Sequence, residues 1–136
     1  MTGSTKLARL AKLRRIETQR AADRQQTVDR QLRQTQDLEH RLTTLIDDYG
    51  HVTGQVSAHA LCASSAQRDR LVKNRLVTRE HAARLEHMLG AARREALNAE
   101  RRERVLGELI DDKRSAEQRE RERKIDLARI GKRRPS

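Results

Sequence analysis

A single charge-free stretch divides this chain into two helical arms. Residues 50–65 contain no Lys, Arg, Asp or Glu, whereas the segments on either side are dense in charge and spaced like helices. Gly50 and Gly54 suit the end of a helix because glycine readily takes positive φ. Ser64 suits the start of the next helix, with Gln67 as its capping-box partner. The stretch predicts a bend; one kinked helix is the alternative, since each glycine costs a helix only about 1 kcal/mol.

The composition favours thin helices over a thick globular core. Of the 136 residues, 38% are charged and 35% are apolar, and Tyr49 is the one aromatic residue. Such a composition suits long helices that share a narrow seam. We therefore predict an all-α fold, an antiparallel two-helix coiled-coil hairpin with a longer second helix. In one domain, the helices are expected at 5–49 and 66–130, and the turn region at 50–65.

Heptad spacing predicts which residues form the seam. In the first arm, the first core position is occupied by Leu7, Arg14, Ala21, Val28, Thr35, Leu42 and Tyr49. The second core position is occupied by Leu10, Glu17, Arg24, Gln31, Leu38 and Leu45. In the second arm, the apolar stripe consists of Leu71, Leu76, Leu85, Met88, Leu89, Ala92, Ala96, Ala99, Leu106, Leu109 and Ile110. Facing positions should have numbers that sum to about 120, and the best packing is expected near the turn, at Leu42, Leu45, Leu71, Leu76 and Leu85.

The second arm is longer, so its last part is expected to overhang without a partner inside the chain. This overhang keeps three large apolar residues, Ile125, Leu127 and Ile130. Basic residues cluster near both ends of the chain, and an antiparallel hairpin brings these clusters toward the same end. They are Lys6, Arg9, Lys12, Arg129, Lys132, Arg133 and Arg134.

The net charge of +11 and the basic clusters have two interpretations: a solvated surface that keeps the chain soluble, or a surface that binds an acidic partner. Nucleic acid is the usual partner of so basic a chain. However, the chain lacks the aromatic side chains that stack on bases, and acids are interspersed through its middle. An acidic protein therefore fits at least as well, and it would also give the apolar residues of the overhang a role.

No residue pattern indicates catalysis, a metal or a cofactor. His59 and Cys62 have ligand-like spacing, but a second pair of ligands is missing. The sequence contains no Gly-rich phosphate loop, nucleophile elbow or Cys-x-x-Cys. It also has neither an apolar run of about 18 residues, as a membrane span requires, nor a signal peptide. We expect a soluble cytoplasmic protein that is not an enzyme and binds no cofactor.

Two motifs in the first arm resemble a known family. They are Leu7-x-x-Leu10-x-x-Leu13-Arg14-x-x-Glu17-x-x-x-Ala21 and Leu38-x-x-x-Leu42-x-x-Leu45-x-x-x-Tyr49. The first resembles the opening of the N-terminal helix in the flagellar export protein FliJ and related stalk proteins of type III secretion, and the second resembles the end of that helix. The resemblance implies an antiparallel coiled coil whose termini enter a hexameric export ATPase and whose turn faces a membrane export gate protein.

The resemblance also implies which residues bind these partners. For the export gate protein they are Leu42, Tyr49 and Leu76. For the ATPase ring we assign the overhang and both basic clusters: Ile125, Leu127, Arg129, Ile130, Lys132, Arg133, Arg134, Lys6, Arg9 and Lys12. Export chaperones are further expected partners, and the protein is expected at the inner face of the cell membrane. The alternative is a basic coiled coil that binds nucleic acid or ribosomes.

Overall fold

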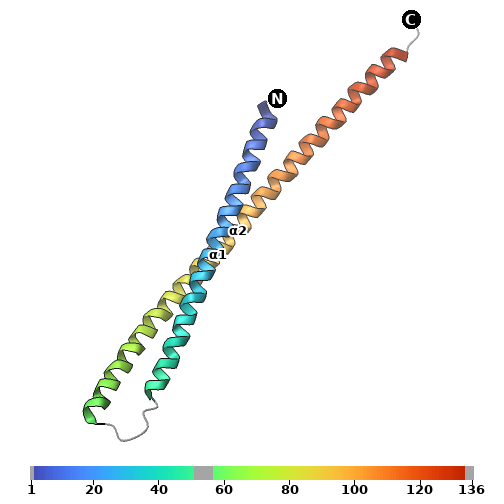
Figure 1. Cartoon of the computed structure of the whole chain (residues 1–136). Coiled ribbons are helices and arrows are strands. Elements are labelled where there is room, and N and C mark those ends of the chain that lie inside the picture. Colours follow the sequence, from blue (N-terminus) through green and yellow to red (C-terminus); the bar gives the residue numbers. More distant parts are fainter. Residues whose placement is uncertain (1, 51–56, 134–136) are drawn as a thin grey trace. The chain divides into compact units, whose positions relative to one another are not determined.

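The computed structural model describes residues 2–50 and 57–133, and these ranges contain two α-helices and no strand. Helix α1 spans Thr2–Gly50, and helix α2 spans Ala58–Arg133 (Figure 1). The predicted all-α hairpin with a longer second helix is confirmed. Both helices extend beyond their predicted ends, since α1 was expected at 5–49 and α2 at 66–130.

Helix α2 begins earlier than the sequence analysis placed it, because Ser57 caps it. The Ser57 hydroxyl oxygen accepts a hydrogen bond from the Ala60 backbone N–H at 3.1 Å, and the Ser57 carbonyl accepts one from the Leu61 N–H at 2.9 Å. A serine that accepts such bonds satisfies donors that a helix start leaves open. The predicted cap at Ser64 is wrong, since this residue lies inside α2. Gly54 lies outside the described residues.

Contacts between the helices divide the chain into two units, each of which is a pair of antiparallel helix segments. The first unit, here called the terminal unit, contains residues 2–20 and 97–133. The second, called the turn unit, contains residues 21–50 and 57–96. Each unit therefore has its own section of the seam between α1 and α2.

The buried and half-buried side chains follow a coiled-coil repeat with alternating spacings of four and three residues. In α1 the seam consists of Leu7, Ala11, Arg14, Thr18, Ala21, Gln25, Val28, Leu32, Thr35, Glu39, Leu42 and Ile46. In α2 it consists of Leu71, Arg75, Thr78, Ala82, Leu85, Leu89, Ala92, Ala96, Ala99, Glu103, Leu106 and Ile110. Several of these residues are polar or small, so the core is thin.

One of the two predicted core positions in α1 is confirmed, and the other is wrong. The series from Leu7 to Leu42 forms one side of the seam, and only its last predicted member, Tyr49, is exposed. The series from Leu10 to Leu45 is exposed throughout. The true second position lies one residue later, where Leu32 and Ile46 are buried. The predicted second series places each member three residues after a member of the first series, whereas the side chains that pack in the seam lie four residues after it.

The predicted stripe on α2 is confirmed except at three residues. Leu76, Met88 and Leu109 are more than half exposed, because they lie off the repeat. The remaining members are buried, and Ile110 is half-buried. Of the five residues expected to pack best near the turn, Leu76 and Leu45 are therefore wrong; Leu45 is 44% exposed, whereas its neighbour Ile46 is 3% exposed.

Two ion pairs between the helices fix the register of the turn unit. Arg24 Nη1 lies 2.6 Å from Glu95 Oε1, and Arg79 Nε lies 2.6 Å from Glu39 Oε1. The numbers of these facing residues sum to slightly less than the predicted 120. The apolar clusters agree with this register: one joins Leu42 and Ile46 to Leu71, and the other joins Leu32 to Ala82, Leu85 and Leu89.

Candidate functional site

The most distinctive surface of the terminal unit is the C-terminal part of α2, which no other described residue covers. Leu7 of α1 and Ile110 of α2 line a common groove, and a Cβ added at Gly3 would lie 3.0 Å from Lys113 Nζ. Beyond this point every side chain from Asp111 to Lys132 is exposed. We call residues 116–133 the unpaired segment; as a helix it is about 27 Å long.

The apolar residues of the unpaired segment do not form a single stripe along the helix. Ile125, Leu127 and Ile130 are each more than half exposed. With 3.6 residues per turn, Leu127 and Ile130 share a face, whereas Ile125 lies almost opposite Leu127. The unpaired segment therefore presents apolar side chains on two sides of one helix.

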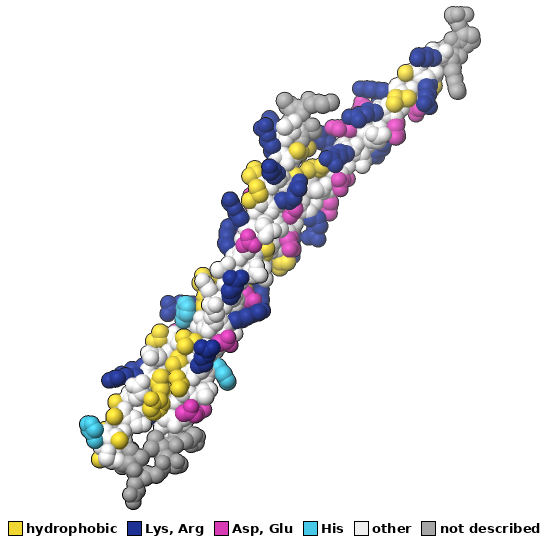
Figure 2. Space-filling view, in the orientation of Figure 1, with side chains coloured by type: hydrophobic (Ala, Val, Ile, Leu, Met, Phe, Trp, Pro, Cys, Tyr) yellow, Lys and Arg dark blue, Asp and Glu magenta, His cyan; other side chains and the backbone are white. Residues whose placement is uncertain are grey.

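Basic residues outnumber acidic ones on the unpaired segment, but the two kinds are mixed (Figure 2). Residues 119–124 read Arg-Glu-Arg-Glu-Arg-Lys, and Arg129 and Lys132 follow. Gln118 Nε2 donates to Glu122 Oε1 at 3.4 Å, which is a weak contact. Acidic side chains therefore lie among the basic ones along the helix.

The two predicted basic clusters lie in the same unit but are not brought together. Lys6, Arg9 and Lys12 are exposed on α1. Lys6 precedes Leu7, which faces Ile110, so about 28 Å of helix separates it from Arg129. The predicted facing rule, with numbers that sum to about 120, already places Lys6 near Arg114 and so implies this offset. Nothing is described of the Arg133 side chain, and Arg134 lies outside the described residues.

The three residues assigned to the gate protein have different environments in the turn unit. Leu42 is buried in the seam, where it clusters with Ile46 and Leu71. Tyr49, at the end of α1, and Leu76, on α2, are exposed. A partner can therefore reach Tyr49 and Leu76 while the seam is closed, whereas Leu42 holds the two helices together.

His59 and Cys62 are both exposed near the start of α2, and Cys62 is a free thiol. In the part of the chain that the structure describes, no three His, Cys, Asp or Glu residues are placed to hold a metal ion. Within residues 2–50 and 57–133, no helix combines the length and apolar character that a membrane span requires.

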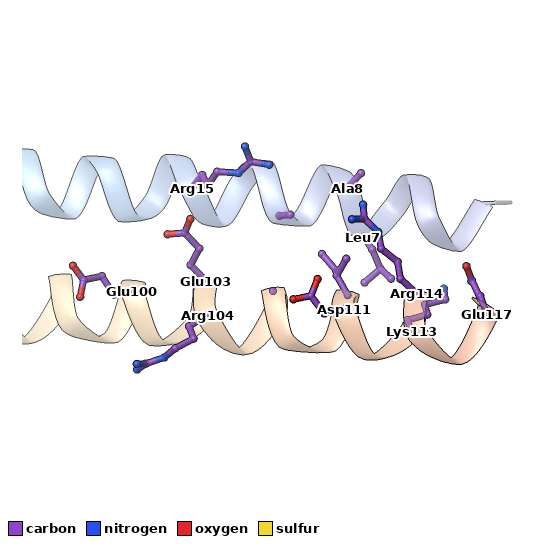
Figure 3. Close-up of a pocket in the computed structure, with 13 residues that line it drawn as sticks. Leu7, Ala8, Arg15, Glu100, Glu103, Arg104, Asp111, Lys113, Arg114 and Glu117 are labelled. Carbon is purple, nitrogen blue, oxygen red and sulfur yellow. The ribbon is translucent and has the colours of Figure 1, made fainter. Parts of the chain in front are cut away.

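Two grooves flank the seam of the terminal unit, and neither was predicted from the sequence. The larger has a volume of about 640 Å³ and a charged lining of both signs; in Figure 3 the Glu103 carboxylate extends from α2 toward α1. The other has a volume of about 380 Å³, and its lining is Leu10, Arg14, Arg101, Arg102, Val105, Leu106 and Leu109. Once the repeat is known, the leucines one residue before its core positions reveal this second groove.

These features define a class of protein by its fold: a two-helix coiled-coil hairpin with a longer second helix. Comparison of the chain with protein families, curated proteins and solved structures finds no match. The resemblance to export stalk proteins therefore rests on the motifs of the first arm and on the hairpin with its longer second helix.

Proposed function

We propose that this protein is a non-enzymatic coiled-coil stalk of a flagellar or type III protein export apparatus. Its unpaired segment inserts into the ring of a hexameric export ATPase, and its turn unit contacts a membrane export gate protein. The observation that carries the proposal is the helical segment 116–133, in which every side chain from Ala116 to Lys132 is exposed and several are apolar.

The energetics of a lone helix support a partner for this segment. The segment continues α2 and needs no helix nucleus of its own, but most helical stability in proteins comes from packing, which this segment lacks within the described residues. Apolar residues on two sides, Ile125 on one and Leu127 with Ile130 on the other, suit a site that surrounds the helix. The lumen of a ring surrounds a helix in this way, and an acidic rim would attract the nearby Arg129 and Lys132.

The turn unit supplies the second contact of the proposal. Tyr49 and Leu76 are exposed there, whereas Leu42 supports the contact indirectly by closing the seam. Binding to the gate protein would hold the stalk at the inner face of the cell membrane. Both grooves of the terminal unit are open to solvent, so neither excludes water as an enzyme site does.

The proposal is tested by measuring ATP hydrolysis by a hexameric export ATPase of the organism that encodes this protein. Full-length protein should stimulate ATP hydrolysis, and deletion of residues 119–136 should abolish both binding and stimulation. The double variant Leu127→Ser/Ile130→Ser should also lose stimulation, whereas Leu97→Ser, an exposed leucine elsewhere on α2, should retain it. Circular dichroism checks that each variant stays helical. Equal stimulation by the full-length and truncated proteins would reject insertion of this segment.

The alternative partner is nucleic acid, which the net charge of +11 favours. Phosphate binding releases counterions, so affinity for RNA would fall steeply with salt. Binding through the apolar residues would persist as salt screens the charges. Tight RNA binding by the intact protein that disappears with added salt, together with no effect on the ATPase, would replace the export proposal.

A further inference from the structure

The coiled-coil repeat leaves apolar residues beside the seam on both helices of the terminal unit. Leu10 immediately precedes the seam residue Ala11, and Leu109 immediately precedes Ile110. In the turn unit the corresponding positions are occupied by Arg24 and Glu95, each of which immediately precedes a seam residue. These two side chains form an ion pair at 2.6 Å, so positions of this kind adjoin each other across the hairpin. In the terminal unit Leu10 and Leu109 accordingly line one groove.

Apolar residues from both helices line this groove. Val105 and Leu109 are 54% and 57% exposed, Leu10 joins them from α1, and the seam residue Leu106 lies between the helices. We call it the apolar groove. The groove on the other side of the seam also has apolar residues in its lining, among them Leu7 and Ile110. It differs in carrying many charged side chains, such as Glu103, Asp111 and Arg114, so the less polar lining is on the side of the apolar groove (Figure 3).

An apolar position beside the seam is typical of a helix that packs against more than one neighbour. A two-stranded coiled coil needs only its two core positions per heptad, whereas bundle helices carry a third apolar position on one flank. Both helices of the terminal unit widen their apolar face on the same side. A third helix laid in the apolar groove would complete such a bundle.

Three arginines line the same groove and determine the charge of its occupant. Arg14 pairs with Glu17 at 2.8 Å, but Arg101 and Arg102 make no ion pair with any carboxylate in the described ranges. An incoming helix with Asp or Glu on its flanks would pair with these guanidinium groups. A second copy of this chain would bring arginines of its own to the interface, and like charges disfavour that pairing.

We infer that the apolar groove of the terminal unit binds an acidic amphipathic α-helix of another protein. The unpaired segment, residues 116–133, contributes nothing to the lining of this groove. The inference is therefore independent of ring insertion, and each can fail without the other.

The probe is a fluorescein-labelled synthetic helix of about five turns, which is about 18 residues. It carries leucines on one face and glutamates along both edges of that face, and its control has lysine in place of every glutamate. Fluorescence polarisation with the full-length protein should show saturable binding of the acidic peptide. The loss of two partly desolvated charge pairs lowers the affinity about tenfold. The lysine peptide should therefore bind at least about tenfold more weakly than the acidic peptide.

Variants locate the binding to the apolar groove. Arg101→Glu and Arg102→Glu together should weaken the acidic peptide by about tenfold, and Leu109→Glu should also weaken it. Arg104→Glu is the matched control, because Arg104 lies on the same helix but lines the other groove. It should leave affinity unchanged. A melting curve for each variant separates lost binding from lost folding.

An environment-sensitive dye gives a second readout that does not depend on charge. It is attached to Val105→Cys, and for comparison to Arg121→Cys, each in a Cys62→Ser background. The peptide should shift the emission of the dye at 105 and leave that at 121 unchanged. Three outcomes would each overturn the inference: the lysine peptide binds as tightly as the acidic one, the Arg101→Glu/Arg102→Glu variant binds the acidic peptide with full affinity, or the emission of the dye at 105 does not change. A dimer seen by sedimentation that buries the dye at 105 would assign the groove to a second copy and would likewise overturn it.

Discussion

The register of the seam predicts opposite outcomes for two adjacent substitutions, Ile46→Ala and Leu45→Ala. Ile46 is 3% exposed and packs against Leu42 and Leu71, whereas Leu45 is 44% exposed and lies off the repeat. Replacing a buried Leu or Ile by Ala typically costs 2–5 kcal/mol, of which part is the cavity left behind. The thin seam allows some collapse, so we expect Ile46→Ala to cost about 2–4 kcal/mol.

The cost of Leu45→Ala is smaller because solvent already reaches that side chain. Full burial of a leucine contributes about 1.5–3 kcal/mol, and the partly exposed Leu45 retains only a fraction of this and leaves no cavity. We expect a loss of about 1 kcal/mol. Urea unfolding followed by far-UV circular dichroism measures both values. An equal loss in the two variants, or a larger loss for Leu45→Ala, would refute the four-residue step that defines the second core position.

Three further outcomes follow from the turn, the polar seam and the facing residues. Ser57→Ala should lower the free energy of unfolding by about 1 kcal/mol through the lost cap, whereas Ser64→Ala should be nearly neutral. A larger loss for Ser64→Ala than for Ser57→Ala would indicate that α2 begins at Ser64. Gln25→Leu should raise the melting temperature, because it replaces a polar core residue of the coiled coil with an apolar one; an unchanged or lower melting temperature would contradict its place in the seam. Cysteines at Arg24 and Glu95, in a chain without the native thiol, should be joined within one molecule by a short bismaleimide, and products only between molecules would contradict the hairpin.

Much of the seam could be predicted from the sequence, because one core position repeats every seven residues from Leu7 to Leu42. The other position could not be placed by hydrophobicity alone. Its members include Thr18, Gln25 and Glu39, while the exposed position beside it carries leucines. An apolar pattern therefore favoured the wrong series. The burial of Ile46 beside the exposed Leu45 resolves the choice, since it shows which of two neighbours faces the partner helix.

The turn was overestimated because absence of charge was taken as absence of helix. Residues 58–63 are uncharged, yet they include three alanines and a leucine, which are strong helix formers. The hydroxyl of Ser57 can cap the first turn of such a segment without any charged neighbour. Charge thus marked the solvated faces of the helices but did not mark where α2 begins.

The exposed end of α2 could be predicted from the unequal arms, whereas its detailed surface could not. The offset between Lys6 and Arg129 follows from the predicted facing rule, whereas the split between Ile125 and Leu127 appears only when the helix period is applied to each residue. The apolar groove depends on both the register of the helices and the helix period. Its leucines were assigned to the seam, so they could not also indicate a surface for a third helix.

The central claim is that the unpaired segment enters a hexameric export ATPase. It is tested most directly by a photo-crosslinking amino acid placed at Leu127 and, as control, at Leu97, with the ATPase and RNA both present. Our account predicts crosslinks from position 127 to the ATPase and none from position 97. Crosslinks from position 127 to RNA, or an ATPase left unmodified at both positions, would contradict it.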